Sequence, residues 1–278
     1  MQKRLAAGRV LPGFGMTMGM TVSFISLMVL IPMAALALEA SRIGWDGFWR
    51  TVTDSRILAG FRVSFGCAFA AALINSVFGL ILAWVLVRCP FPGRRLMEGL
   101  IELPFALPTA VAGIALTTLY SGKGWIGSLF APYGIHIAYA PAGIVIALTF
   151  ITLPFAVRTT QPALEQLDPQ YEEAGRVLGA SGRRIFRRIV LPELMPAVLT
   201  GFGLSFARGL GEYGSVVFIA GNMPYVTEIA PLLIMGKLES FAYGEATAVA
   251  LVMLVTSFAV MLVINRIQAR ASGFAGNV

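Results

Sequence analysis

The sequence is poor in charged residues, histidine and cysteine, and each shortage excludes a class of protein. Charged residues make up 13% of its 278 residues and hydrophobic residues 57%, whereas a soluble domain averages about 25% charged residues. The mean hydropathy is +0.80. This composition excludes a water-soluble domain and predicts a polytopic membrane protein.

The few cysteines and the single histidine exclude common metal and disulfide sites. Cys67 and Cys89 have neither the number nor the spacing of a disulfide framework or a metal site, and we interpret both as packing residues. His136 is the single histidine, which excludes a histidine-rich metal site. It lies in a predicted outer segment, and we interpret it as structural. We therefore expect no metal site.

Sequence signatures of catalysis are also missing. The chain has no G-x-x-x-x-G-K-S/T phosphate-binding loop, so we do not expect it to bind ATP in that manner. Glu212 is the only carboxylate predicted inside a membrane span, whereas an aspartyl-type intramembrane protease needs a pair of them. We expect no catalytic residue and no cofactor on this chain.

Long apolar runs, by contrast, are abundant. Six are each long enough to cross a hydrocarbon layer of about 30 Å, which takes roughly 20 helical residues. The first exceeds the apolar region of a signal peptide, which favours a retained signal anchor over a cleaved signal. The expected fold class is therefore all-α, with about six transmembrane helices at residues 16–38, 63–87, 103–120, 137–157, 194–220 and 246–265.

Lysine and arginine are distributed unequally between the two sides of these spans. With the amino terminus inside, the inner segments hold fourteen of these residues and the outer segments six. Because cytoplasmic loops carry the excess of positive charge, both termini are predicted to be cytoplasmic. The formal net charge of +7 is thus a topology signal, and we expect no nucleic-acid partner.

The longest inner loop contains a basic, glycine-punctuated segment, residues 173–192, which we call the basic loop. Ahead of it, Asp168 and Pro169 predict a helix start, with Asp168 as the N-cap and Pro169 at the first helical position. Gly179 and Gly182 are expected to break that helix.

The second half of the basic loop is amphipathic. Ile185 and Ile189 are four residues apart, so residues 183–192 predict a helix with one apolar face and one face of arginines. We therefore expect a helix–turn–helix at the membrane surface. Two interpretations remain open: a docking element for a soluble partner, or an interfacial loop whose arginines reach anionic lipid.

The spacing of the basic loop resembles the E-A-A, x3, G, x9, I-x-L-P signature of the permease subunits of binding-protein-dependent ABC importers. The matching positions are Glu173, Ala174, Gly179, Ile189, Leu191 and Pro192. Gly175 departs from the pattern, since the family usually has a second alanine there. The resemblance implies a type I ABC importer permease fold in which these seven residues couple the chain to a separate ATPase. It also implies that the loop forms a coupling helix that inserts into a cleft of that ATPase.

The same resemblance implies a simple domain organisation. A cytoplasmic amino-terminal tail, residues 1–15, precedes a transmembrane permease domain, residues 16–265. A cytoplasmic coupling loop, residues 161–192, lies within that domain. A cytoplasmic carboxy-terminal tail, residues 266–278, follows it.

Three further segments, residues 103–113, 211–222 and 227–232, resemble the sulfate and molybdate permease branch, and most closely the T-type subunit of sulfate/thiosulfate importers. The resemblance implies a multi-pass protein of the bacterial inner membrane. It also implies three partners: a dimer of ATPase subunits that bind ATP and Mg, a W-type second permease subunit and a periplasmic sulfate-binding protein. A molybdate or tungstate permease, a homodimer, a secondary transporter and a membrane-embedded enzyme remain alternatives.

Two prolines mark the third predicted span. Pro104 and Pro108 are four residues apart, and each removes a backbone donor, so together they are expected to kink or unwind that span. Such backbone is tolerated where it is buried in protein or lines a wet cavity. This favours a place beside the translocation pathway, and a purely structural kink is the alternative.

An ion pair is predicted in the fifth span. Arg208 and Glu212 are one helical turn apart, and because charges at bilayer depth are unfavourable they should face inward. One hypothesis is that Arg208 weakly attracts an oxyanion while Glu212 limits how tightly the anion is held, with Tyr213 on the same translocation pathway. A self-satisfied internal salt bridge is the alternative.

Overall fold

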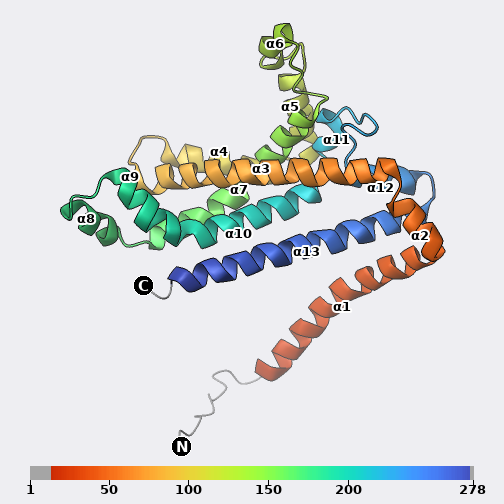
Figure 1. Ribbon diagram of the computed structural model, residues 1–278, viewed down its shortest axis with the longest axis horizontal. Helices are drawn as coiled ribbons and strands as arrows, with labels where there is room; N and C mark the ends of the chain where they lie inside the picture. Colours follow the sequence, from red (N-terminus) through yellow and green to blue (C-terminus); the bar gives the residue numbers. More distant parts are fainter. Residues whose placement is uncertain (1–13, 276–278) are drawn as a thin grey trace, which may run out of the picture.

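The computed structural model describes residues 14–275, and every regular element in that range is helical, as expected. Figure 1 shows an elongated arrangement in which α3, α7, α10 and α13 run along the long axis. The predicted tail residues 1–13 and 276–278 lie outside the described range. The elements are α1 (Phe14–Ser41), α2 (Gly44–Val52), α3 (Ser55–Arg88), α4 (Arg94–Ala106), α5 (Thr109–Tyr120), α6 (Gly127–Phe130), the 3-10 turn η1 (Ala131–Tyr133), α7 (Pro141–Gln166), α8 (Pro169–Val177), α9 (Gly182–Ile185), the π turn η2 (Phe186–Val190), α10 (Leu191–Leu210), α11 (Val216–Ile219), α12 (Ala230–Glu239) and α13 (Tyr243–Ala275).

The number of membrane spans agrees with the sequence. Within residues 14–275, five helices are long and apolar enough to cross a membrane: α1, α3, α7, α13 and one continuous helix, Gly182–Leu210, that contains α9, η2 and α10. A pair of helices, α4 and α5, makes up to six if the two count as one broken span. The prediction of about six spans is confirmed.

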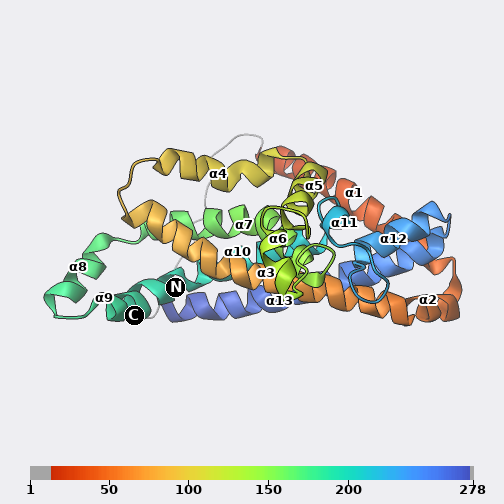
Figure 2. The same ribbon diagram turned by 90° about the horizontal axis from the view of Figure 1, so that it is seen from above.

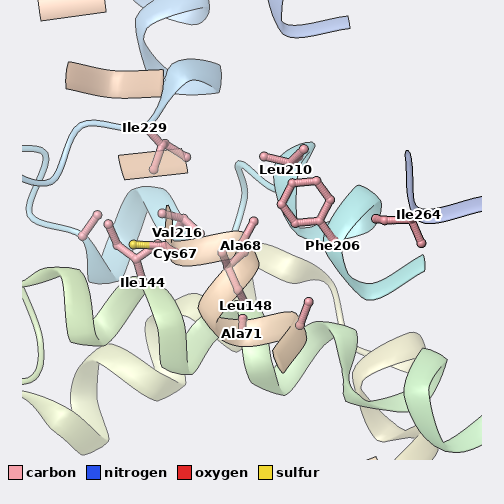
Figure 3. Packing of buried hydrophobic residues seen from close by; sticks show 12 residues of the cluster. Cys67, Ala68, Ala71, Ile144, Leu148, Phe206, Leu210, Val216, Ile229 and Ile264 are labelled. Carbon is pink, nitrogen blue, oxygen red and sulfur yellow. The ribbon is translucent and has the colours of Figure 1, made fainter. Parts of the chain in front are cut away.

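The core lies where α3, α7 and α10 meet. Figure 3 shows small side chains of α3 packed against larger ones of α7 and α10. The labelled residues of these three helices are Cys67, Ala68, Ala71, Ile144, Leu148, Phe206 and Leu210. Cys67 is therefore a packing residue, as expected, whereas Cys89 is exposed just past the end of α3, where the chain leaves the core, and its interpretation as a packing residue is wrong.

Buried hydrogen bonds also join the three core helices. The Asn75 amide nitrogen on α3 donates to Thr152 Oγ1 of α7 over 2.8 Å, and the Ser205 hydroxyl on α10 donates to the Thr152 carbonyl over 3.1 Å. Hydrogen bonds between transmembrane helices contribute about 0.6 kcal/mol each on average. The three helices thus form one body that connects the two ends of the molecule (Figure 2).

The third predicted span is broken rather than merely kinked. α4 and α5 meet at an angle of 111°. The break lies at Pro108, which precedes the first residue of α5, whereas α4 continues through Pro104, a buried residue inside the helix. The break at Pro108 is expected, because the residue before a proline is pushed out of the helical region, and Leu107 is extended with ψ of 134°.

The fourth and fifth predicted spans have different bounds in the structure. α7 begins at Pro141, a residue suited to the first helical position, and continues to Gln166, beyond the predicted end at residue 157. α10 ends at Leu210, so the prediction of a helix to residue 220 is wrong. The backbone turns at Gly211, and the Ser215 backbone N–H donates to the Glu212 carboxylate instead of continuing a helix.

Candidate functional site

α8, at one far end of the molecule (Figures 1 and 2), is capped at both termini. The Asp168 carboxylate accepts the Gln170 backbone N–H at 2.9 Å, which confirms the predicted N-cap. At the other end, Gly179 N–H donates to the Arg176 carbonyl and Ala180 N–H to the Gly175 carbonyl, the pattern of a Schellman motif. Gly179 has φ of +77°, a conformation that favours glycine. This glycine therefore ends α8, as predicted.

The inner face of α8 is anchored by a residue that the sequence analysis missed. Glu172 is 6% exposed, and its Oε1 lies 3.0 Å from Arg88 Nη2 at the end of α3. Arg88 also donates to the Leu167 carbonyl just before α8. One turn further along α8, a Cβ at Gly175 would lie 3.0 Å from Ile185 Cγ1, so glycine allows α8 to approach α9 closely. Glu172 and Gly175 share the buried face of α8.

The opposite face of α8 is exposed. Glu173 and Ala174 both lie on it, as expected for contact residues. Val177 and Leu178, which sequence reasoning did not single out, are 87% and 86% exposed, respectively. Because large apolar side chains so exposed at the tip of a helix are unusual outside an interface, this face has the character of a docking surface. The 3.6-residue helical period places Glu172 and Gly175 on one face of α8 and the exposed residues on the other. That period is the sequence signal from which both faces could have been predicted.

The return from α8 toward the core is a continuous helix rather than a separate surface helix. Gly182 begins α9 instead of breaking a helix, and η2 leads directly into α10, in whose first turn Pro192 lies. The first helix of the predicted helix–turn–helix is thus confirmed as α8. The prediction of a separate second helix is wrong, because that segment continues into α10. Leu191 and Ile189 are half-buried, and Pro192 is exposed. Proline is tolerated at this point because the π turn before it already departs from α-helical hydrogen bonding.

At the other end of α10, the predicted ion pair forms. Arg208 Nη1 lies 2.6 Å from Glu212 Oε2, although Glu212 falls just after the end of the helix. The Glu212 side chain is 2% exposed and that of Arg208 is 37% exposed. Glu212 Oε1 also accepts the backbone N–H of Ser215 at 3.0 Å and its hydroxyl at 3.1 Å. Glu212 is therefore held firmly, and the side chain of Arg208 is partly exposed.

The structure brings the break at Pro108 next to this ion pair. A Cβ at Gly113 of α5 would lie 2.5 Å from the Ser215 carbonyl oxygen, and one at Gly214 would lie 2.2 Å from Thr109 Oγ1. The start of α5 therefore packs tightly on the segment that carries Glu212. Pro104 is buried within α4, and Tyr213 is half-buried next to Glu212 in sequence.

A second long-range ion pair lies at the opposite end from α8. Arg56, at the start of α3, forms a two-pronged contact with Glu228, with distances of 2.7 Å from Nε to Oε2 and 2.6 Å from Nη2 to Oε1. Ser64 Oγ accepts the backbone N–H of Ala230 at 2.7 Å. These contacts fix the segment before α12 to α3, and nothing in the sequence spacing predicts them.

Residues 75–273 match the family of binding-protein-dependent transport system inner membrane components, a range that includes α8, the basic loop and the Arg208–Glu212 pair. The chain belongs to this family. Among its relatives is the "Sulfate transport system permease protein CysT" of Salmonella typhimurium, which is 45% identical over 266 residues that cover 96% of each chain. A CysT protein of Synechocystis sp. is 45% identical over 89% of this chain and 87% of its own.

Solved structures support the fold of this family member. A chain of a bacterial alginate ABC transporter matches with a TM-score of 0.75 at 16% identity, covering 93% of this chain and 95% of its own. A chain of the MetNI methionine ABC transporter matches with a TM-score of 0.59 at 16% identity, covering 77% and 95%. At such identities the likeness concerns the fold, which is that of ABC importer permeases.

Proposed function

We propose that the chain is the membrane-spanning permease subunit of an ATP-driven, binding-protein-dependent importer of sulfate and thiosulfate. The observation that carries this proposal is α8, a helix anchored on one face and apolar and exposed on the other, in a chain similar to CysT proteins along nearly its whole length. Such a helix can transmit force only if a partner grips its free face.

The partner proposed for the free face is a dimer of ATPase subunits, which bind ATP and Mg, so this chain itself is not an enzyme. Val177 and Leu178 would enter an apolar cleft of the ATPase, with Glu173 and Ala174 beside the contact. The Arg88–Glu172 pair then carries a displacement of α8 into α3. Ile189, Leu191 and Pro192 carry the same displacement into α10.

The translocation pathway is proposed to pass Arg208. Its guanidinium group is partly accessible and already paired with Glu212, so its attraction for an oxyanion is weakened. Transport benefits from this weakness, because an ion must be bound well enough to enter and loosely enough to leave. The break at Pro108 and the half-buried Tyr213 would shape the pathway beside it.

The remaining partners are those that the resemblance to sulfate importers implies. Arg208 is partly exposed in this single subunit, and a second permease, of the W type that the resemblance implies, would complete the pathway beside it. A periplasmic sulfate-binding protein would deliver the anion at the end that carries the Arg56–Glu228 pair. The excess of lysine and arginine on the α8 side supports insertion in the bacterial inner membrane with both termini in the cytoplasm.

Uptake of labelled sulfate in a strain lacking this subunit tests the proposal. Expression of the chain should restore uptake, unlabelled thiosulfate should compete, and an ATPase subunit should co-purify. Stronger competition by molybdate than by sulfate would assign the chain to molybdate or tungstate. Uptake that persists with an ATPase unable to hydrolyse ATP would identify a secondary transporter instead.

A further inference from the structure

Four arginines gather on one face of the helix that leads into α10. Arg183 and Arg187 are one turn apart, as are Arg184 and Arg188, so their guanidinium groups form two neighbouring rows. All four residues are exposed. Together with Ser181 they line a surface hollow of about 450 Å³, and no other described residue contributes to its lining. We call this the arginine hollow.

The opposite face of the same helix fixes the direction in which the arginines point. Ile185 is 3% exposed and Val190 is fully buried, both in a cluster with Leu164 of α7. Phe186 packs edge-on against Trp84 of α3, with ring centroids 5.4 Å apart. A π turn closes between residues five apart, so η2 places Ile185 and Val190 on the same inward side. The arginines therefore point away from the bundle.

Nothing in the described part of the chain neutralises these four charges. None of the four guanidinium groups forms an ion pair with a described carboxylate. By contrast, Arg88 and Arg176, close by, both reach Glu172. Like charges one turn apart on a helix repel each other. The hollow therefore presents a concentrated positive charge to an anion from outside the chain.

The position of the hollow along the helix identifies the source of that anion. The helix Gly182–Leu210 has 29 residues, which at 1.5 Å per residue is about 43 Å, close to the thickness of a bilayer with both headgroup layers. The last charged residue before its apolar part is Glu193, little more than one turn beyond Arg188, so the two turns that carry the arginines adjoin the headgroup level, which long arginine side chains can reach. The ATPase is the less suitable source, because α8 lies further out from the spans than α9 (Figure 1).

We propose that the arginine hollow binds the phosphodiester headgroup of an anionic phospholipid. Guanidinium groups match phosphate oxygens in two-pronged contacts, and two neighbouring rows can hold one phosphate from two sides. The bound headgroup would fix the start of the Gly182–Leu210 helix, and with it the base of α8, at the membrane surface. This proposal requires only that the helix crosses the bilayer and is independent of the transported substrate.

Native mass spectrometry of the full-length protein, purified with the subunits that accompany it and titrated with phosphatidylglycerol, tests the proposal. The unmodified protein should retain phosphatidylglycerol in preference to phosphatidylcholine. The variant Arg184→Gln/Arg188→Gln should bind it roughly thirtyfold more weakly, since each arginine near an anionic surface contributes about a fivefold factor. The matched control Arg95→Gln/Arg266→Gln removes the same charge elsewhere and should leave binding unchanged.

Several outcomes would overturn the proposal. One is equal binding of phosphatidylglycerol by the Arg184→Gln/Arg188→Gln variant and by the unmodified protein. Another is displacement of the lipid by millimolar inorganic phosphate, which would show a site for the free anion. If the Arg184→Gln/Arg188→Gln variant no longer co-purifies with the ATPase but still binds lipid, the hollow would be assigned to a protein contact. If the Arg184→Gln/Arg188→Gln variant fails to assemble, the salt dependence of lipid binding by the unmodified protein is the test. Its preference for phosphatidylglycerol should weaken steeply with rising salt, and salt-insensitive binding would overturn the proposal.

Discussion

Arg88 and Glu172 form a largely buried ion pair between α3 and α8, 84 residues apart in sequence. Because Arg88 also donates to the Leu167 carbonyl, a single guanidinium group contacts both α8 and the chain segment just before it. The pair is the only described side-chain hydrogen bond from α3 to α8. A movement of α8 therefore reaches the core through this contact and through the packing of α8 on α9.

Replacing Glu172 by Gln should weaken the contact between Arg88 and α8 and leave the exposed apolar face of α8 unchanged. A hydrogen bond to a charged group contributes about 1.5–3 kcal/mol, so α8 would lose its fixed position. We expect the ATPase still to co-purify while sulfate transported per ATP hydrolysed falls at least about tenfold. The exchange Arg88→Glu/Glu172→Arg should recover part of the loss.

Glu165→Gln is the matched control for the Glu172 variant, because Glu165 is exposed at the same end of the molecule. Its transport should equal that of the unmodified protein. Full coupling in the Glu172→Gln variant would show that the ion pair does not transmit the movement of α8.

Leu178→Ser should weaken attachment of the ATPase directly. The side chain is 86% exposed and supports no core packing, so the stability of the permease should stay within about 0.5 kcal/mol. Its burial at an interface would contribute about 1.5–3 kcal/mol. We expect tenfold or more weaker co-purification of the ATPase, measured by quantitative pull-down, and no effect from Val226→Ser at the other end. Undiminished attachment would remove Leu178 from the docking surface.

Gly113→Ala should separate α5 from the segment that holds Glu212. The added Cβ would meet backbone, lying 2.5 Å from the Ser215 carbonyl oxygen, which cannot rotate away as a side chain can. Such overpacking costs about 1–3 kcal/mol. We expect a lower unfolding temperature and reduced sulfate uptake. Gly99→Ala, where a Cβ meets nothing within 4 Å, is the control, and equal behaviour of the two variants would contradict the close contact.

Arg208→Gln should sharply reduce oxyanion uptake without loss of assembly. The Glu212 carboxylate keeps its two bonds from Ser215, so the turn after α10 should persist. Uptake of labelled sulfate and co-purification of the ATPase measure the two effects separately. Arg208→Lys should retain part of the activity because it keeps the charge. Unchanged uptake in Arg208→Gln would leave the pair a purely structural salt bridge.

Local chemistry accounts for the features that the sequence could predict. The spans follow from hydropathy, the start of α8 from Asp168 and Pro169, and its end from Gly179. The break at Pro108 follows from steric conflict with the residue before it. Each of these depends on residues within one or two helical turns of each other.

The features that could not be predicted depend on contacts between distant segments. Glu172 is buried because Arg88 reaches it from another helix, and Glu228 is buried because Arg56 does. The end of α10 at Leu210 was missed because the following residues are apolar enough for a span, and only the bonds from Ser215 to Glu212 show why the helix stops. No spacing rule within one segment contains this information.

The π turn of η2 has one residue more than an α-helical turn would hold. Deleting a residue there would restore an ordinary α-helical turn, in which residues four apart share a side, so Ile185 and Val190 would still face inward. The π turn thus absorbs one residue without turning α8 relative to the Arg208 end of the same rod. A one-residue insertion or deletion elsewhere along the rod would instead turn α8 by about 100° relative to Arg208.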